Sequence, residues 1–165
     1  RKDLAIVAQA LELVEAAHLA AQSYPTLSGG EKQRVHLARV LAQIWEKPET
    51  RARYLLLDEP TAGLDLSHQH LTLQTARRFA ERETAVLVVL HDLNLAAQYA
   101  DKVMILHGGR KFAFDAPQNV LTSAAIREVF EIETYVARHA EIKDMPVIIP
   151  IGRVSQKQNA FKAKV

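Results

Sequence analysis

Residues 54–61 read Tyr-Leu-Leu-Leu-Asp-Glu-Pro-Thr, and this stretch decides the fold. The unbroken apolar run at its start is too short for an ordinary helix, so it predicts a strand covered on both faces, as in a parallel sheet. Residues 85–90, Ala-Val-Leu-Val-Val-Leu, repeat the pattern, and residues 67–82 between them carry apolar positions at helical spacing. Strand, helix and strand in this order predict a βαβ crossover and hence an α/β fold.

Apolar residues at helical spacing also lie on both sides of this βαβ unit. Residues 3–20 and 28–45 are predicted helices, separated by the breaker Tyr24-Pro25-Thr26. Downstream, Gly108-Gly109 is the predicted turn of a hairpin. The other predicted elements are a helix at 93–100, hairpin strands at 103–106 and 111–114, helices near 117–121 and 123–130, and strands around 135–138 and 147–149.

The composition restricts the possible partners. The 165 residues fit one domain, and a net charge of +2 gives no broad basic surface, so no nucleic-acid partner is expected. The absence of cysteine excludes disulfides, thiolate metal sites and cysteine catalysis. No run approaches the roughly 20 apolar residues that span a bilayer. A role at a membrane is therefore expected to depend on partner subunits.

Two adjacent carboxylates, Asp58 and Glu59, follow the first predicted strand. Open α/β sheets place ligand sites at the carboxyl ends of their strands. A Mg²⁺ ion near phosphates takes one or two carboxylate oxygens and keeps several waters, which suits Asp58. Glu59 is then placed to polarise a water that attacks a γ-phosphate. The structural alternative is a pair of acids that only cap a strand end.

The segment Leu-Ser-Gly-Gly-Glu at residues 27–31 predicts a capped helix start. Ser28 is a good N-cap, and Glu31 three residues later completes a capping box. Capping alone does not explain Gly29 and Gly30, because each glycine weakens a helix start by roughly 0.5–1 kcal/mol relative to alanine. Two glycines at a positive helix end let backbone N–H groups approach an anion, so this helix start is a candidate phosphate contact.

Two further polar residues occupy ends of predicted elements. His91 directly follows the strand 85–90 and could donate a hydrogen bond to a γ-phosphate or to the attacking water. Asp65, in the segment Ala62-Gly63-Leu64-Asp65, could cap the helix that begins near Leu66. Taken alone, each is better explained by a structural role.

In their chain order these pieces resemble the ABC ATPase family motif by motif, over residues 1–150. The resemblance implies a P-loop NTPase-like ABC ATPase fold, present in part, with a parallel sheet core and a helical subdomain. It assigns residues 3–45 to the helical subdomain with the signature helix, 54–150 to part of the catalytic core, and 151–165 to a C-terminal tail.

The resemblance also implies roles for single residues, with ATP and Mg²⁺ as cofactors. Glu59 would be the catalytic base and His91 the switch histidine, and Asp58 would hold Mg²⁺ through water. The signature residues and the D-loop aspartate would contact a nucleotide held mainly by a second copy in a homodimer. These residues are Ser28, Gly29, Gly30, Glu31 and Asp65.

The sequence contains no Gly-x-x-x-x-Gly-Lys-Ser/Thr phosphate loop. The glycine-rich segment Gly-Gly-Arg-Lys at residues 108–111 is a predicted hairpin turn instead. The family's Walker A loop, Q-loop glutamine and first strands are expected upstream of Arg1. The chain alone is therefore expected to bind MgATP weakly and not to hydrolyse it, although the family is a hydrolase.

Finer resemblances point to one subgroup of importers. Residues 37–45, 65–70 and 91–101 look like the ATPases that serve siderophore, cobalamin and haem import. The Ala-Gln-Ile-Trp end of residues 42–45 and the stretch 48–53 look most like the haem (hemin) importer ATPases. This implies a peripheral protein on the cytoplasmic face of a bacterial inner membrane, with permease subunits as partners and a periplasmic haem-binding protein as an indirect partner.

Three alternatives stay open at this stage. The cargo could be a siderophore or cobalamin, because other subunits choose it. A soluble DNA-repair type of ABC ATPase shares several motifs but would carry long coiled coils and a basic surface. A non-catalytic relative would have lost chemistry, whereas Glu59 and His91 are both intact. The seven histidines are expected to be structural or superficial apart from His91, and no haem ligand is expected.

Overall fold

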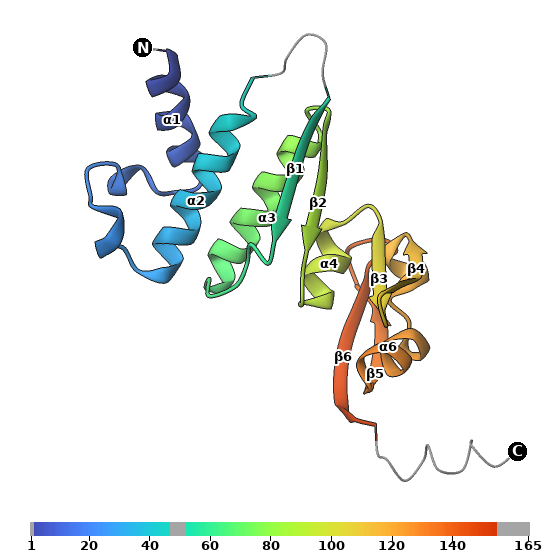
Figure 1. The fold of residues 1–165 in the computed structure, drawn as a ribbon. Coiled ribbons are helices and arrows are strands. Elements are labelled where there is room, and N and C mark those ends of the chain that lie inside the picture. The colour runs from blue at the N-terminus through green and yellow to red at the C-terminus, as the bar shows by residue number, and fades with distance from the viewer. Residues whose placement is uncertain (1, 47–51, 155–165) are drawn as a thin grey trace, which may run out of the picture. The chain divides into compact units, whose positions relative to one another are not determined.

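The computed structural model describes residues 2–46 and 52–154, and the chain divides into two compact units, Arg1–His91 and Asp92–Val165 (Figure 1). The elements of the first unit are α1 (Lys2–Leu13), the short 3₁₀ helices η1 (Ala17–Leu19) and η2 (Tyr24–Thr26), α2 (Gly29–Gln43), β1 (Arg53–Asp58), α3 (Leu66–Ala80) and β2 (Thr84–Val89). The expected division between residues 3–45 and 54–150 stays a prediction.

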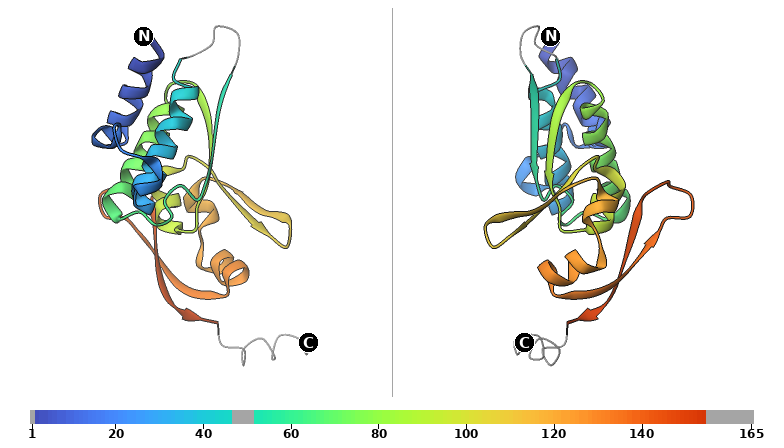
Figure 2. Two further views of the ribbon diagram at one scale, coloured as in Figure 1. Left: turned by 60° about the vertical axis from the view of Figure 1, so that its left-hand side comes forward. Right: turned by 90° about the vertical axis from the view of Figure 1, so that its right-hand side faces the viewer.

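Strands β1 and β2 pair in parallel through six residue pairs, from Arg53 with Thr84 to Asp58 with Val89. Helix α3 connects them, so the predicted βαβ crossover is confirmed. The helices pack on one face of this sheet (Figure 2), where Leu55 and Leu57 join a buried cluster with Leu41 of α2 and Phe79 of α3. Period-2 alternation along β1 places these leucines on the same face.

The prediction that both faces of the two strands are covered is wrong for the described residues. Tyr54 and Leu56 of β1 are 66% and 69% exposed, and Leu87 and Val89 of β2 are 53% and 47% exposed. These four side chains alternate with buried or partly buried ones, so they occupy the opposite face. An unbroken apolar run shows that both faces of a strand are apolar, and it does not identify what covers either face.

Helix α1 is shorter than the predicted helix 3–20 because the chain leaves it at a Schellman motif. Glu15 takes a left-handed backbone conformation with φ = 54°. The N–H of Ala16 donates to the carbonyl of Leu11 (2.8 Å), and the N–H of Glu15 donates to that of Glu12 (3.0 Å). A glycine usually marks this position, and its absence concealed the helix end.

Arg53 is a buried cation held by helix ends instead of by an acid. Its guanidinium donates to the carbonyls of Ile44 and Trp45 after α2 and to that of Arg82 after α3, and the residue is 7% exposed. The negative ends of helix dipoles favour a cation. Arg53 thereby ties the start of β1 to the ends of both packing helices.

The second unit has its own core. Its elements are α4 (Leu93–Tyr99), β3 (Val103–His107), β4 (Arg110–Asp115), α5 (Pro117–Val120), α6 (Ser123–Phe130), β5 (Ile132–Arg138) and β6 (Pro146–Arg153). Strands β3 and β4 form the predicted hairpin, and β5 and β6 form a second antiparallel pair. Leu121, Ile126 and Ile148 are among the buried residues between these elements.

The outer edge of β6 offers few hydrogen-bond donors. The His139 N–H donates to the Met145 carbonyl (2.9 Å), so antiparallel alternation turns the backbone groups of residues 146, 148 and 150 away from β5. Pro146 and Pro150 have no N–H, and the side chain of Asn94 bonds both backbone groups of Ile148, at 2.8 and 3.0 Å. Such an edge resists pairing with another strand.

Strand β6 runs to Arg153, so residues 151–153 of the expected tail are part of the fold, while the rest of that tail from residue 155 lies outside the described residues. Within the described ranges, no helix combines the length and apolarity that crossing a bilayer requires.

Candidate functional site

Ser28 caps α2 as the sequence predicts. Its hydroxyl accepts from the Glu31 N–H (3.4 Å), and its own N–H donates to Glu31 Oε2 (2.8 Å), which completes the capping box. The Ser28 side chain and backbone N–H are the main causes that hold the pKa of Glu31 below its usual value. Helix α2 begins at Gly29, one residue after the predicted start.

The glycines of this helix start are not required by packing within the described chain. A Cβ on Gly29 would meet nothing within 4 Å, and one on Gly30 would meet Leu64 Cδ2 at an ordinary 3.5 Å. Internal sterics therefore leave room for side chains at both positions. The open space is available to a group from outside the chain.

Asp65 caps α3 and carries a second contact that sequence reasoning missed. It accepts from the His68 N–H (2.9 Å), and both carboxylate oxygens lie 2.8 Å from His68 Nδ1. The backbone N–H and then the ring of His68 are the main causes that lower the pKa of Asp65. His68 lies three residues after Asp65, which is the ordinary spacing of an N-cap residue and its N3 partner. This spacing is the sequence signal that could have predicted the contact.

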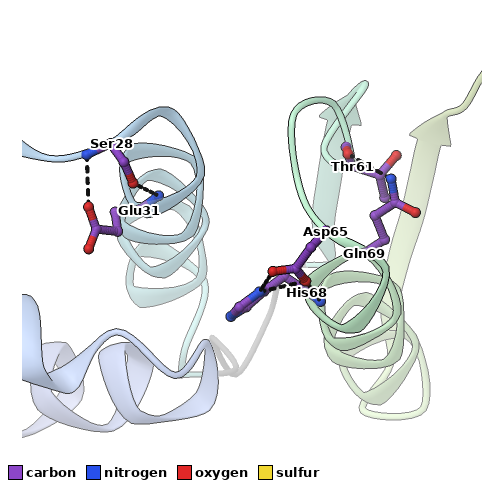
Figure 3. A network of polar contacts seen from close by, with 6 residues as sticks. All are labelled: Ser28, Glu31, Thr61, Asp65, His68 and Gln69. Carbon is purple, nitrogen blue, oxygen red and sulfur yellow. Dashed lines mark hydrogen bonds and ion pairs between the residues drawn. The ribbon is translucent and has the colours of Figure 1, made fainter.

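The signature segment and the D-loop segment line one hollow of about 430 Å³. Its walls are Ser28, Gly30, Glu31 and Arg34 at the start of α2, and Gly63, Leu64, Asp65 and His68 from the loop and start of α3. Figure 3 shows Ser28 and Glu31 on one side and Asp65 and His68 on the other. Arg34 Nε is buried and has no hydrogen-bond partner among the described residues. The fold thus brings together four of the five candidate nucleotide contacts, and Gly29 is not part of the lining.

Glu59 and His91 form the second cluster. His91 Nε2 lies 2.6 Å from Glu59 Oε1, and the two side chains are 80% and 47% exposed respectively. They follow the carboxyl ends of the neighbouring parallel strands β2 and β1, which explains why residues 32 positions apart meet. An accessible carboxylate paired with an imidazole at a strand end can hold and move a proton.

Asp58 is the last residue of β1 and is exposed beside Glu59. A free carboxylate at a strand end is a hard oxygen donor of the kind that Mg²⁺ prefers, so its chemistry fits the expected metal. Among the described residues no group of three or more histidines and acids could hold a metal ion by itself. Asp58 would therefore need ligands from water or from a phosphate.

Two glutamines that the sequence did not single out as site residues contact the loop after Glu59. Gln33 Nε2 of α2 donates to the Pro60 carbonyl (3.3 Å), and Gln69 Nε2 of α3 donates to the Thr61 carbonyl (3.4 Å). The Gln33 bond joins parts of the chain that only tertiary folding brings together.

Comparison with known proteins agrees with this arrangement. Residues 2–62 match the family model described as ABC transporter. Together with the similarities below, this match confirms the resemblance to ABC ATPases that the order of the motifs predicts.

Curated proteins similar to this chain include hemin import ATP-binding proteins named HmuV. The one from Gloeobacter violaceus is 55% identical over 157 residues, which cover 95% of this chain and 57% of that protein. The one from Pseudomonas entomophila is 56% identical over 149 residues, covering 90% of this chain and again 57% of the relative. The chain thus spans a little over half the length of these relatives.

Solved structures agree on the fold. An inward-facing ABC transporter assigned to the metal-chelate type matches with a TM-score of 0.69 and 26% identity, over 93% of this chain and 58% of that one. The bacterial ABC transporter cassette MJ0796, in a dimeric structure, matches with a TM-score of 0.59 and 28% identity, over 68% of this chain and 46% of that one. The expected α/β ABC ATPase fold, present in part, is confirmed.

Proposed function

We propose that this chain is a part, with the signature segment, of the ATP-hydrolysing, energy-coupling subunit of a bacterial ABC importer for hemin. The observation that carries the proposal is the Glu59–His91 contact of 2.6 Å at the ends of two parallel strands, in a chain 55% identical to a hemin import ATP-binding protein. The proposed location is the cytoplasmic face of the inner membrane, with permease subunits as partners and the periplasmic haem-binding protein as an indirect one.

Each site residue has a separate task in this proposal. The Glu59 carboxylate accepts a proton from the water that attacks the γ-phosphate. The His91 imidazole holds Glu59 in place and donates toward the phosphate. Asp58 would hold Mg²⁺ through water, and the ion would supply positive charge against the phosphate oxygens.

The hollow between α2 and the D-loop would receive the nucleotide of a second copy. Ser28 offers a hydroxyl and a helix start, and Gly29 and Gly30 leave the helix end open to a phosphate. Glu31 keeps the Ser28 backbone fixed through the capping box, and Asp65 fixes the D-loop on the opposite wall. The dimeric structure of the related MJ0796 cassette supports a homodimer.

The test is a hybrid ATPase. Replacing the 157 matched residues of the Gloeobacter violaceus relative by this chain should give an enzyme that hydrolyses MgATP, whereas the 165-residue chain alone should not. Glu59→Gln in the hybrid should lower kcat by about 10²–10⁴-fold, because the carboxylate that takes the proton is lost. The measurement is phosphate release from MgATP by the hybrid, by the Glu59→Gln hybrid and by the chain alone, side by side. A hybrid without activity, or rapid hydrolysis by the chain alone, would contradict the proposal.

The cargo needs its own experiment. In a Pseudomonas entomophila strain lacking its HmuV protein, the hybrid should restore growth on hemin as the iron source. The hybrid could instead restore growth on a ferric siderophore or cobalamin uptake, without restoring growth on hemin. That result would leave the importer assignment standing and contradict hemin as the cargo.

A further inference from the structure

Glu59 has an unusual backbone conformation for its residue type. Its φ is 46°, in the left-handed region that glycine occupies easily and a side-chain-bearing residue occupies rarely. Such a conformation persists only where the surroundings hold it, and it is often found at functional sites. The contacts that hold Glu59 are therefore candidates for residues that control its position.

Two backbone hydrogen bonds hold Glu59 directly. Its N–H donates to the Val89 carbonyl of β2 (3.1 Å), and its carbonyl accepts from the Ala62 N–H (3.1 Å), which closes a turn over residues 59–62. The peptide groups in the middle of this turn are held from outside it. The Pro60 carbonyl accepts from Gln33 Nε2 and the Thr61 carbonyl accepts from Gln69 Nε2.

Gln33 differs from Gln69 in where it is anchored. Gln69 belongs to α3, which directly follows the same loop in the chain. Gln33 belongs to α2, 27 residues before Pro60, and lies five residues after the capping Ser28. Pro60 is buried, so its carbonyl has little access to water and depends on the amide that Gln33 supplies.

We propose that Gln33 is a positioning residue for Glu59, which fixes the loop 59–62 to the signature helix through the Pro60 carbonyl. The proposal rests on the proposed function, because it takes Glu59 as the proton acceptor. Helix α2 starts at the signature segment, which would contact the nucleotide held by the second copy, whereas Glu59 would act on the nucleotide held by its own copy. A shift of α2 would therefore move Glu59.

The experiment compares four single variants in the hybrid ATPase, with kcat and KM for ATP measured separately. Gln33→Met and Gln33→Glu remove the N–H donor at similar length, Gln33→Lys keeps a donor on a long stem, and Gln43→Met is the matched control on an exposed site of α2. The loss of the donor should lower kcat about 10- to 100-fold with KM within about twofold, since small misplacements of catalytic groups have effects of this size. Gln33→Lys should recover most of kcat, and Gln43→Met should match the parent.

The same variants in the isolated 165-residue chain give a readout that needs no hydrolysis. In ¹H–¹⁵N NMR spectra, Gln33→Met should shift the amide signals of Glu59, Thr61 and Ala62 and the ring signals of His91, whereas Gln43→Met should not. If Gln33→Met does not fold, Gln33→Glu serves in its place.

The outcomes separate the two proposals. A hybrid without ATPase activity defeats the proposed function, and the NMR comparison then decides on Gln33. An unchanged kcat, a rise in KM alone, no recovery in Gln33→Lys, or unperturbed signals of residues 59–62 would each overturn the positioning role.

Discussion

Single carboxylates set the local geometry of this chain at several loop ends. Asp92 accepts from the N–H groups of Asn94 and Leu95 at the start of α4, as Asp65 does at the start of α3. Asp115 has more partners, namely Lys102 Nζ (2.9 Å), Asn119 Nδ2 (2.9 Å) and the Ala116 N–H (2.7 Å). It joins the end of the hairpin β3–β4 to α5.

The pH dependence of the second unit should depend on Asp115. The Lys102 hydrogen bond, followed by those of Asn119 and Ala116, lowers the pKa of Asp115 from 3.8 to about 2. A depressed folded-state pKa contributes stability above the unfolded value, and this contribution is lost as pH falls through the folded value. Urea unfolding between pH 5 and pH 2 should therefore show a steeper loss for the parent than for Asp115→Asn, mainly between pH 4 and 2. Equal slopes would contradict this.

At the level of elements, ends were harder to predict than the elements themselves. Helices α2, α3 and α4 begin at ordinary capping residues, and Ser28, Asp65 and Asp92 occupy their N-cap positions. The end of α1 has no such signal, because a glutamate occupies the left-handed position of its Schellman motif. The turn is imposed by packing of the following segment, in which Ala16 and Leu19 are buried in the core.

The same substitution should have opposite effects within α1 and just after its end. Glu15→Gly should stabilise the chain by roughly 0.5–1 kcal/mol, because the left-handed conformation costs a side-chain-bearing residue about 1–2 kcal/mol and glycine loses part of this gain in the unfolded state. Glu12→Gly, within the helix, should destabilise by about 1 kcal/mol. Chemical denaturation of both variants measures the difference. A destabilised Glu15→Gly chain would show that the turn is not strained.

For the whole molecule, the feature with the largest consequence is the uncovered apolar face of β1 and β2. Leu56 and Leu87 are opposite each other in the register, with Tyr54 and Val89 near them on the same face. A contiguous exposed apolar patch marks an interaction surface or a site of aggregation. Solubility of the chain on its own should depend on this face.

Replacing this face should reduce self-association without unfolding the chain. Leu56→Thr with Leu87→Thr should lower the weight-average mass in sedimentation equilibrium, because less apolar area is buried by association. The neighbouring Leu55 is 1% exposed, so Leu55→Thr should instead destabilise the fold by roughly 2–4 kcal/mol. Unchanged association of the double variant would show that another surface is responsible.

Sequence patterns predicted the elements of the first unit because the physics behind them is local. Helical spacing and capping residues located α2 and α3, and short apolar runs located β1 and β2. The capping box of Ser28 and Glu31 followed from two residues one turn apart. Strand-end acids and His91 were likewise visible, because parallel strands deliver their carboxyl ends to one edge.

The sequence by itself determined the resemblance to ABC ATPases, the order of motifs and the residues that can carry chemistry, since these depend on residue types and short spacings. Only the tertiary structure decided which of them meet. Three examples join residues 8 to 32 positions apart: the contact between Glu59 and His91, the hydrogen bond from Gln33 to Pro60, and the hydrogen bonds from Arg53 to backbone carbonyls. No local pattern encodes such contacts, because they arise when separate elements pack against a common core.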